Sequence, residues 1–571
     1  MMLRLIVVIT LQLSVLQLNS QKAFQFHPPL KIPMYLSGNF GEIRDDHFHS
    51  GIDIKTGGVT GHPVHSIGEG YISRIKVQAN GYGKSVYINH PTGHTSVYGH
   101  LDQYISRIAS FVEDIQYRRR SHTVDIYLKP GQFPVEKGEI IGFSGNSGSS
   151  SGPHLHFEIR TTGDQHPTNV LHYGFDITDR MAPRFFRLFL YPISDSSQVA
   201  GSHQKFSSGT FSRNGNYALS YGSEITALGS IGCGVEVFDY LNGSLNRCGV
   251  YKLELFVNEA RVYRHIMDEF AFSETRFINA HIDYGERVSS GGKVHRLYRL
   301  PNDRLRIYEA LVSDGRVRIE PDKVYDLRVV ATDVAGNSSE LIFKIRGAAN
   351  PVTTKKTAGQ DVQHMPYHRV NRFVRQGLEV EIPAFALYED LDFRYKRTTF
   401  RDSPPGELYH IHSPETPVHL PYRLSIKTED MDSGLNEKLC LVVYDNQGKP
   451  SHVGGAYTDG AVEAEVRQFG TFSVSLDTIA PEIIPLNRSI NGDFAGEKTL
   501  RFTIRDDLSG IETYEGYIDN SWALFEYDPK NELLTYTFDD QRIRQGSGHE
   551  LELYVTDAKG NVNLFHTTFV W

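Results

Sequence analysis

The chain has 571 residues, which at roughly 150 residues per domain predicts three or four domains. Apolar residues make up 39% and charged residues 22%, a balance that favours several packed cores over wholesale disorder. The 59 Lys and Arg against 68 Asp and Glu give a net charge of −9, which argues against a nucleic-acid binder. Three cysteines exclude a disulfide scaffold and a Cys-rich zinc array, while plentiful Gly, Tyr and Phe favour strands and tight turns.

The first twenty residues have the pattern of a signal peptide. Arg4 supplies a basic start, an apolar stretch runs from Leu5 to Leu18, and Ser20 is a small residue at the expected cleavage site. The apolar stretch is shorter than the ~20 residues that span a bilayer, which disfavours the alternative of an uncleaved anchor. We therefore expect an exported protein, in the periplasm, at the cell surface or secreted, with no membrane span in the mature chain.

The region from Gln21 to about Asp176 is dense in Gly and His, and short β-type runs dominate it. Gly or Asn-Gly turns separate these runs, as is typical of a strand-rich domain. Only Gln103 to Asp114 has a helical pattern. The expected strands are 70–77, 85–89, 95–98, 139–143 and 155–159.

The rest of the chain carries an internal repeat. Two segments open with Asp-x-x-Ala-Pro, at 179–183 and 477–481, and close with Thr-Asp-x-x-Gly-Asn, at 332–337 and 556–561. Asp and Asn can cap such a turn and Gly can take its positive φ, so the closing motif predicts the last hairpin of a β-sandwich. A calcium site is the alternative, and turn chemistry is favoured because no clustered third and fourth carboxylate is evident.

These repeats predict β-sandwich domains at 179–346 and 477–571. Alternating stretches such as 422–427 and 471–476 predict a further β-sandwich at 369–476. Residues 347–368, rich in Ala, Thr, Lys and Pro, are interpreted as a linker.

Three histidine clusters in the front region have the residue types of a metal site. His49 and Asp53 form a His-x-x-x-Asp, His100 follows Tyr-Gly, and His154 and His156 form a His-x-His. A strand turns every second side chain to the same face, so His154 and His156 should project together. Imidazole nitrogen and carboxylate oxygen suit Zn²⁺, and three protein ligands plus a water are typical of a catalytic zinc site.

Together these segments resemble the lysostaphin/LytM-type zinc endopeptidases, which cut peptide bonds in peptidoglycan. The resemblance covers roughly residues 40–160, and its motifs occur in the order of that family. They lie at 49–53, 61–64, 68–72, 81–86, 98–101, 135–142, 145–148 and 154–158. The resemblance implies a small antiparallel β catalytic domain over 21–176, a duplicated-hybrid-motif-like barrel. The whole chain would then be mainly β, with two or three Ig-like sandwiches after this domain.

By that resemblance His49, Asp53 and His156 hold one Zn²⁺ per chain, and His100 and His154 flank the water and the scissile carbonyl. Either imidazole could take the proton of the water, and a protonated imidazole could stabilise the oxyanion or protonate the leaving amine. The expected function is an exported zinc-dependent endopeptidase that hydrolyses stem peptides or cross-links of peptidoglycan.

Two other functions compete with this prediction. One is a catalytically silent LytM-like regulator that binds and activates another wall hydrolase. Silent relatives usually lose zinc ligands, whereas all three ligands and both accessory histidines are present here. The other is an adhesion or scaffolding array, in which the front domain is secondary.

An insertion, Ile108 to Phe133, separates this sequence from the family pattern. We interpret it as a solvent-exposed surface segment. The alternative is that it forms a wall of the substrate groove, where its arginines contact substrate carboxylates. His122 within it could join the site but is not expected to, and His47 is the best alternative ligand because it lies two residues before His49. His62, His65, His90 and His94 are interpreted as surface or packing residues.

The back of the chain is expected to position the enzyme or bind a partner protein. Its histidines look scattered, with no second His/Asp cluster of ligand spacing, and His410-Ile411-His412 is interpreted as surface. A fragment ending near Asp176 should therefore still cut small wall peptides. Cys233 and Cys248, 15 residues apart, are expected to form a disulfide after export, with Cys440 left as a buried apolar residue.

Overall fold

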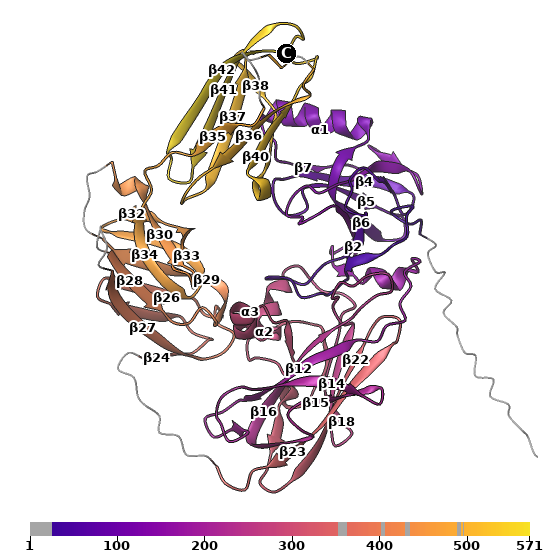
Figure 1. Ribbon diagram of the computed structural model, residues 1–571, viewed down its shortest axis with the longest axis vertical. Helices are drawn as coiled ribbons and strands as arrows, with labels where there is room; N and C mark the ends of the chain where they lie inside the picture. Colours follow the sequence, from indigo (N-terminus) through magenta and orange to yellow (C-terminus); the bar gives the residue numbers. More distant parts are fainter. Residues whose placement is uncertain (1–25, 352–361, 401–405, 429–433, 488–492, 495) are drawn as a thin grey trace, which may run out of the picture.

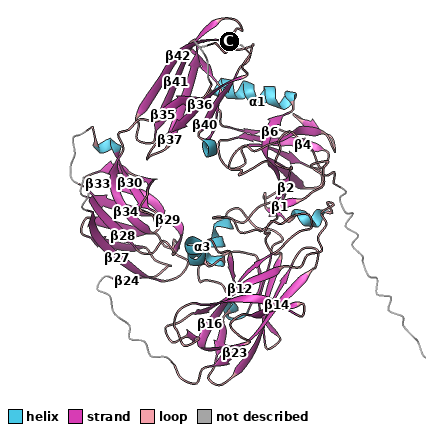
Figure 2. Ribbon diagram, viewed as in Figure 1, coloured by secondary structure: helices cyan, strands magenta, loops and turns pink. Residues whose placement is uncertain are grey.

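The computed structural model describes residues 26–351, 362–400, 406–428, 434–487, 493–494 and 496–571. Strands dominate the chain, which confirms the prediction of a mainly β protein with β-sheet units after a β-rich front region (Figure 2). The predicted signal peptide lies outside the described residues. Within those residues, no helix has both the length and the apolarity needed to cross a bilayer.

The front unit, residues 26–178, is one antiparallel sheet of eleven strands in the order β1-β2-β10-β6-β5-β4-β7, with the four others paired onto this path. The strands are β1 (Leu36–Gly38), β2 (Ile52–Lys55), β3 (Pro63–His65), β4 (Gly70–Val77), β5 (Lys84–Asn89), β6 (His94–Tyr104), β7 (Val124–Tyr127), β8 (Pro134–Val135), β9 (Ile140–Ser144), β10 (His154–Thr161) and β11 (Pro167–Thr168). All five predicted strands are present: β4 has the predicted bounds, β9 is shifted by one residue, and β5, β6 and β10 are longer than predicted. A short 3₁₀ helix, η1 (Val170–Tyr173), follows.

Strand β10 lies at the centre of this sheet, and its register brings the histidine clusters together. It pairs with β2 on one side, where His156 faces Asp53, and with β6 on the other, where His156 faces Gly99. Alternation places Leu155, Phe157 and Ile159 in the core and sends His154 and His156 to the opposite face. One strand therefore joins three motifs that are about 50 residues apart in sequence.

The insertion after β6 forms helix α1 (Ser106–Arg119), which begins and ends later than predicted. Ile108 and Val112 face the front core, and the helix ends where Arg120 takes a left-handed conformation. Its far end contacts the last unit of the chain: the Arg542 guanidinium lies 3.9 Å from the centre of the Tyr117 ring, and Trp522 meets the same ring edge-on. The insertion is thus an interface between domains, which the prediction of a solvated excursion missed.

The second unit, residues 179–351, is a 12-stranded sheet. Its strands are β12 (Arg184–Pro192), β13 (Gln198–Val199), β14 (Phe206–Arg213), β15 (Asn216–Leu219), β16 (Glu224–Phe238), β17 (Lys252–Val257), β18 (Ala260–Ile266), β19 (Val294–Arg296), β20 (Tyr308–Leu311), β21 (Val317–Ile319), β22 (Val324–Thr332) and β23 (Ser338–Gly347). Strand β16 pairs antiparallel with β12 and parallel with β23, so the sheet closes on itself rather than forming two separate layers. Helical segments η2 (Thr275–Phe277), α2 (Ile278–His281), α3 (Tyr284–Ser290) and η3 (Val312–Gly315) lie in its connections.

The third unit, residues 362–476, has a six-stranded and a five-stranded sheet around one core. Its elements are β24 (Val362–Met365), β25 (Asn371–Arg375), β26 (Leu378–Ile382), β27 (Leu391–Phe400), β28 (Gly406–Ile411), β29 (Pro417–Lys427), η4 (Asn436–Lys438), β30 (Leu439–Tyr444), β31 (Pro450–Gly454), β32 (Ala456–Thr458), β33 (Ala461–Gln468) and β34 (Gly470–Leu476). The segment predicted as a linker thus already contains strand β24 in its described part. His410 and His412 are half-buried here and hydrogen-bond to threonines.

The fourth unit, residues 477–571, has two four-stranded sheets around its own core. Its elements are β35 (Glu482–Pro485), β36 (Thr499–Arg505), β37 (Ile511–Ile518), β38 (Ser521–Ala523), β39 (Phe525–Asp528), η5 (Pro529–Asn531), β40 (Leu533–Thr537), β41 (Gly548–Asp557) and β42 (Val562–Val570). The four units follow one another around a ring, and the last one returns to α1 of the first (Figure 1).

Both predicted closing hairpins are present, as β22–β23 and β41–β42. The Asn561 side chain donates to the Asp557 carboxylate and also to the Asp477 carbonyl oxygen, so the opening and closing motifs of the repeat are in contact. Each motif pair also gathers a third carboxylate, which sequence reasoning missed. The clusters are Asp179, Asp239 and Asp333 in the second unit and Asp477, Asp506 and Asp557 in the fourth.

The predicted disulfide between Cys233 and Cys248 is wrong. Both thiols are free and buried, as is that of Cys440, for which burial was expected. Cys233 lies in the core of the second unit, whereas Cys248 packs with the core of the front unit. The two cysteine side chains therefore belong to different cores. Their separation of 15 residues in sequence does not reveal that they pack in different domains.

Candidate metal centre

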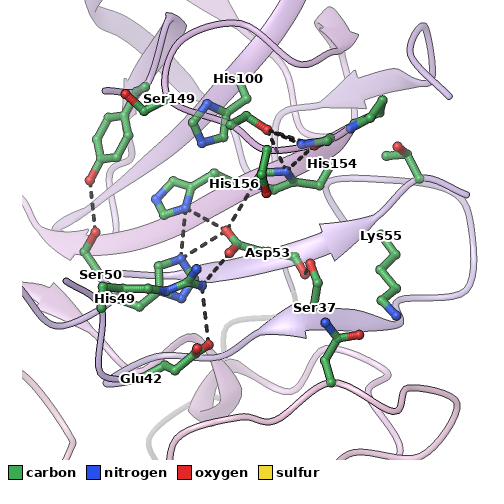
Figure 3. Close-up of a pocket in the computed structure, with 18 of the residues that line it drawn as sticks. Ser37, Glu42, His49, Ser50, Asp53, Lys55, His100, Ser149, His154 and His156 are labelled. Atoms are coloured by element: carbon green, nitrogen blue, oxygen red, sulfur yellow. Dashed lines mark hydrogen bonds and ion pairs between the residues drawn. The ribbon is translucent and has the colours of Figure 1, made fainter. Parts of the chain in front are cut away.

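His49, Asp53 and His156 point toward one another in the structure (Figure 3). His49 lies in the loop before β2, Asp53 on β2 and His156 on β10. Asp53 Oδ1 is 3.0 Å from His49 Nε2 and 3.0 Å from His156 Nδ1, and these two nitrogens are 3.1 Å apart. All three residues are buried, so the donor atoms face each other in a site largely closed to bulk water.

The hydrogen bonds of both imidazoles leave the converging nitrogens with lone pairs. A carbonyl oxygen can only accept, so His49 must donate from Nδ1–H to the Asn39 carbonyl oxygen, 2.8 Å away. His156 donates from Nε2–H to Glu158 Oε1, 2.7 Å away. In a neutral imidazole the opposite nitrogen then carries the lone pair. Two imidazole nitrogens and one carboxylate oxygen form a donor set that fits Zn²⁺.

The charges of the site favour an ionised Asp53. Burial opposes the charge, but the neighbouring imidazoles of His49, His154 and His156 outweigh it and hold the pKa of Asp53 well below its usual range. Arg44 pairs with the second carboxylate oxygen, Oδ2, at 2.7 Å, which leaves Oδ1 for the histidines. Burial lowers the pKa of His49 and so favours its neutral, metal-binding form.

Glu158 supports His156 from behind and was missed as a functional residue. It is fully buried and accepts hydrogen bonds from His156, Arg160 and Ser50, and from the Tyr82 hydroxyl. Such a carboxylate behind a ligating histidine fixes the tautomer and the ring orientation. The signal was present in the sequence, because Glu158 continues the alternation of His154 and His156 along one face of β10.

His100 and His154 lie together beside this cluster, with ring centres 4.8 Å apart. His100 donates from Nδ1–H to the Ser147 carbonyl oxygen and His154 from Nδ1–H to the Gly152 carbonyl oxygen, both at 2.8 Å. Each ring therefore has Nε2 available, and His154 Nε2 is 3.4 Å from Asp53 Oδ1. Burial, with smaller contributions from His156 and His154, lowers the pKa of His100 to about 3, so this ring is neutral.

The cluster opens into a cavity of about 950 Å³. The wall includes the loop 149–153, Tyr82 and Arg44 from the front unit, and Asn246 and Arg247 from the second unit. None of the lining residues comes from the insertion, so the described structure gives no support to the insertion as a groove wall.

The remaining candidate histidines lie apart from the donor cluster. His47 is largely exposed and contacts Asp46 at 2.9 Å, so it is not brought into the ligand set. His122 is buried against the fourth unit, where its Nδ1 meets the Tyr514 hydroxyl at 3.3 Å. His62, His65 and His90 bond to backbone carbonyls and His94 to Thr92, consistent with packing or surface positions.

Residues 47–117 and 113–169 match peptidase family M23, and residues 362–477 match the Zu5-like domain. A DD-carboxypeptidase/endopeptidase of Neisseria meningitidis serogroup B is 33% identical over 115 residues, 20% of this chain and 20% of that protein. A peptidoglycan DD-endopeptidase of Vibrio cholerae serotype O1 is 30% identical over 158 residues, 26% of this chain and 30% of that protein. The chain thus spans less than a third of the length of either relative.

Among solved structures, the catalytic domain of the M23 protein EnpA from Enterococcus faecalis covers 25% of this chain and 94% of its own, with 26% identity and a TM-score of 0.19. The residues that match family M23 include His49, Asp53, His100, His154 and His156. The chain therefore contains a peptidase M23 domain of the LytM/lysostaphin type, homologous to peptidoglycan DD-endopeptidases.

Proposed function

We propose that this protein is an exported, zinc-dependent endopeptidase that hydrolyses peptide bonds in peptidoglycan stem peptides or cross-links. The observation that carries the proposal is the convergence of His49, Asp53 and His156 at 3.0–3.1 Å beside a cavity that His100 and His154 also line. In this proposal the first three residues hold one Zn²⁺ and the other two act on protons.

The completeness of the site favours an active enzyme over a silent regulator. A silent protein has no need for a buried carboxylate that orients a ligating histidine, yet Glu158 accepts from His156 at 2.7 Å. It also has no need for two further imidazoles whose Nδ1–H groups are fixed by backbone carbonyls. These supports are the ones that a reacting centre requires, because catalytic groups must be held in place by their surroundings.

A bound zinc ion would supply Lewis-acid chemistry, making water more acidic and a peptide carbonyl more electrophilic. The chain's own residues would then move the protons. His154 Nε2, beside Asp53, can accept a proton from the attacking water and later donate it to the leaving amine. His100, held neutral with Nε2 available, can take either proton role or donate to the developing oxyanion when protonated.

The substrate class follows from the relatives and from the site. Two relatives are named as a DD-carboxypeptidase/endopeptidase and a peptidoglycan DD-endopeptidase, and the residues that match family M23 contain the whole donor cluster. The cavity wall mixes the hydroxyls and backbone of Ser149 to Ser151 with the charges of Arg44 and Arg247. Such a lining suits a polar peptide that carries carboxylates, as wall stem peptides do.

The units behind the catalytic domain are proposed to position it and to bind a partner protein, through domains at about 179–346, 369–476 and 477–571. Export to the periplasm or cell surface would bring the enzyme to its substrate. Neither role requires chemistry in these units.

The test is digestion of purified peptidoglycan by the full-length, zinc-loaded protein, with new termini identified by mass spectrometry. New amino and carboxyl termini within stem peptides or cross-links are expected, and His154→Ala protein serves as the metal-bound control. Intact peptidoglycan after incubation with folded, zinc-loaded protein would argue for the regulator instead. Stimulation of a separate wall hydrolase by the same preparation would then support that reading directly.

A further inference from the structure

A second group of three histidines converges in the second unit, where none was expected from sequence. His265 lies on β18, His281 ends α2, and His295 lies on β19. Their nitrogens lie within 4.8 Å of one another. The residues are separated by 16 and 14 positions in sequence, a spacing without a recognisable motif. The prediction that the back of the chain lacks such a cluster is therefore wrong.

The spacing within this group repeats that of the catalytic cluster. His281 Nε2 lies 3.0 Å from His295 Nδ1, as His49 Nε2 lies 3.1 Å from His156 Nδ1. In both places one imidazole offers Nε2 and the other Nδ1. Ligand atoms about 2.0–2.1 Å from a tetrahedral zinc ion lie a little more than 3 Å from each other, so both pairs have the separation of co-ligands.

The outer nitrogens of two of these rings have fixed partners. His265 Nδ1 meets the Tyr263 hydroxyl at 2.8 Å, and His281 Nδ1 meets the Tyr308 hydroxyl at 3.2 Å. Tyr308 in turn donates to Asp303 Oδ2. A hydroxyl that donates to a carboxylate must accept from the imidazole, so His281 carries its proton on Nδ1 and its lone pair on Nε2. Metal-ligating histidines are typically oriented by such outer partners.

The inner nitrogen of His265 has no protein partner among the described residues. His265 Nε2 is fully buried and accepts or donates no hydrogen bond among the described residues. Native structures contain few orphaned buried nitrogens, because such a group loses its hydrogen bonds to water without gaining a partner. The three side chains are 0%, 0% and 3% exposed, which closes the cluster to bulk water.

We propose that His265, His281 and His295 bind a second divalent metal ion, Zn²⁺ by preference, in a structural centre separate from the catalytic one. Three imidazoles suit Zn²⁺ among the biological metals, with Cu²⁺ and Ni²⁺ as competitors. Three ligands leave one coordination position, but the burial of all three rings closes that position to a substrate. The centre therefore acts on structure and not on the peptide bond.

The location explains what such a centre would stabilise. The histidines border an apolar cluster shared by three units, which contains Phe48 from the front, Phe270 and Ile282 from the second and Tyr388 from the third. The Phe48 ring lies 5.8 Å from the His281 ring, edge-on, and Phe48 immediately precedes His49. A metal joining β18, α2 and β19 would fix the surface on which the His49 segment rests.

The experiment measures the number of zinc ions bound per full-length chain. The protein is incubated with Zn²⁺, the excess is removed, and the bound metal is quantified by mass spectrometry. We expect two zinc ions per wild-type chain, one in His49→Ala, one in His281→Ala and none in the double variant. His419→Ala is the matched control, because His419 stacks on Phe277 in the same region but belongs to neither cluster, and it should keep two. X-ray absorption of zinc-loaded His49→Ala protein should show a first shell of imidazole nitrogens.

A stability measurement separates metal binding from a packing role. In the His49→Ala background, a chelator should lower the Tm, and His281→Gln should abolish that difference. One zinc per wild-type chain together with none in folded His49→Ala protein would overturn the second centre and leave the proposed function standing. The test remains valid if the His281 variants misfold. The zinc contents of the wild-type and His49→Ala proteins alone show whether a second centre exists, and neither protein alters the second cluster. Full zinc in His49→Ala would instead contradict the catalytic ligand assignment.

Discussion

Asn39 of the catalytic domain and Gly249 of the second unit exchange two hydrogen bonds. The Asn39 amide donates from Nδ2–H to the Gly249 carbonyl oxygen at 2.8 Å, and the Gly249 backbone N–H donates to Asn39 Oδ1 at 2.7 Å. The Asn39 carbonyl oxygen is the acceptor that orients His49. Gly249 of the second unit thus holds Asn39, 210 residues away in sequence, whose backbone carbonyl oxygen sets the tautomer of a proposed zinc ligand.

The first prediction concerns the catalytic ligands. His49→Ala and His156→Ala should each lose one equivalent of zinc, because each removes one of three donors that meet at 3.0–3.1 Å. Metal analysis of the folded variants is the measurement. His47→Ala is the control and should keep the wild-type content, since the exposed His47 side chain pairs with Asp46 and not with the donor cluster. Full zinc in both ligand variants would show that the metal lies elsewhere.

The second prediction separates proton transfer from metal binding. His154→Ala and His100→Ala should keep the wild-type zinc content but lose about 10²–10⁴-fold in kcat, the usual contribution of a general acid or base. Initial rates on a soluble wall peptide, measured beside metal analysis of the same samples, provide the check. Unchanged turnover in both variants with zinc bound would contradict the proton-transfer roles assigned to His154 and His100.

The convergence of His49, Asp53 and His156 could be predicted because its signals are local. His154 and His156 share a face of β10 through simple alternation, and His49 and Asp53 are four residues apart, so short patterns carry the chemistry. The strands and helix α1 were predictable for the same reason. Their boundaries depend on neighbouring strands and shifted by a few residues, as at the start of α1, Ser106.

The supporting contacts could not be predicted because they join different strands or different units of the fold. The pairing of Asn39 with Gly249 and the convergence of His265, His281 and His295 depend on how β-sheets meet, which no short pattern encodes. The thiols of Cys233 and Cys248 fail as a pair for the same reason, because they lie in different cores. Closeness in sequence is a poor guide where a chain folds into contacting β-units.

The third prediction tests the carboxylate behind His156. Glu158→Gln replaces one of two oxygens that accept from His156 and Arg160 with an amide that donates, so one of these hydrogen bonds is lost. Zinc affinity should fall by about 10–100-fold, the usual cost of changing such a partner. The free energy of unfolding should fall by about 3–5 kcal/mol, because buried Arg160 loses its counter-charge.

Zinc titration and denaturant unfolding of the Glu158→Gln protein are the measurements. Glu139→Gln is the control, since its ion pair with Arg107 is part-exposed and worth about 1 kcal/mol or less. Equal zinc affinity in the Glu158→Gln and wild-type proteins would show that His156 does not depend on this carboxylate.

The fourth prediction concerns the closure of the ring. Lys530 of the fourth unit donates to the carbonyl oxygens of Asn146 at 2.8 Å and Gly148 at 3.0 Å, on either side of Ser147. The Ser147 carbonyl oxygen orients His100. Lys530→Met should therefore lower kcat by up to about tenfold, equivalent to ~1.4 kcal/mol of barrier, with little change in KM.

The matched control for Lys530→Met is Lys344→Met, a surface lysine paired with Asp326 in the second unit. It removes the same charge from the chain without touching the 146–148 loop, so its kinetics should equal wild type. A Lys530→Met enzyme with unchanged kcat would show that the fourth unit contacts the catalytic loop without constraining His100.

The fifth prediction reverses the expectation that the front unit works alone. A fragment ending at Asp176 loses Gly249 and the Phe270 ring, which lies 5.1 Å from Phe40 and 5.8 Å from Phe48. Exposing these two phenylalanine rings costs about 1.5–3 kcal/mol each, and the segment that leads into His49 loses its support. We expect this fragment to aggregate or to bind zinc more weakly than the full chain, and to cut small soluble wall peptides far more slowly.

A fragment ending at residue 351 distinguishes support of His49 by the second unit from a requirement for the full-length chain. It keeps Gly249, the Phe270 ring and Thr275, whose side-chain hydroxyl accepts from the Phe48 N–H at 2.9 Å, but lacks Lys530. Its zinc affinity should match the full chain, and its kcat should fall only as far as that of Lys530→Met, because the same contact is missing. The fragment ending at Asp176 could instead be monomeric, bind zinc fully and turn over small peptides like the full chain. In that case the second unit does not support His49, and the contact between Asn39 and Gly249 serves only to hold the two units together.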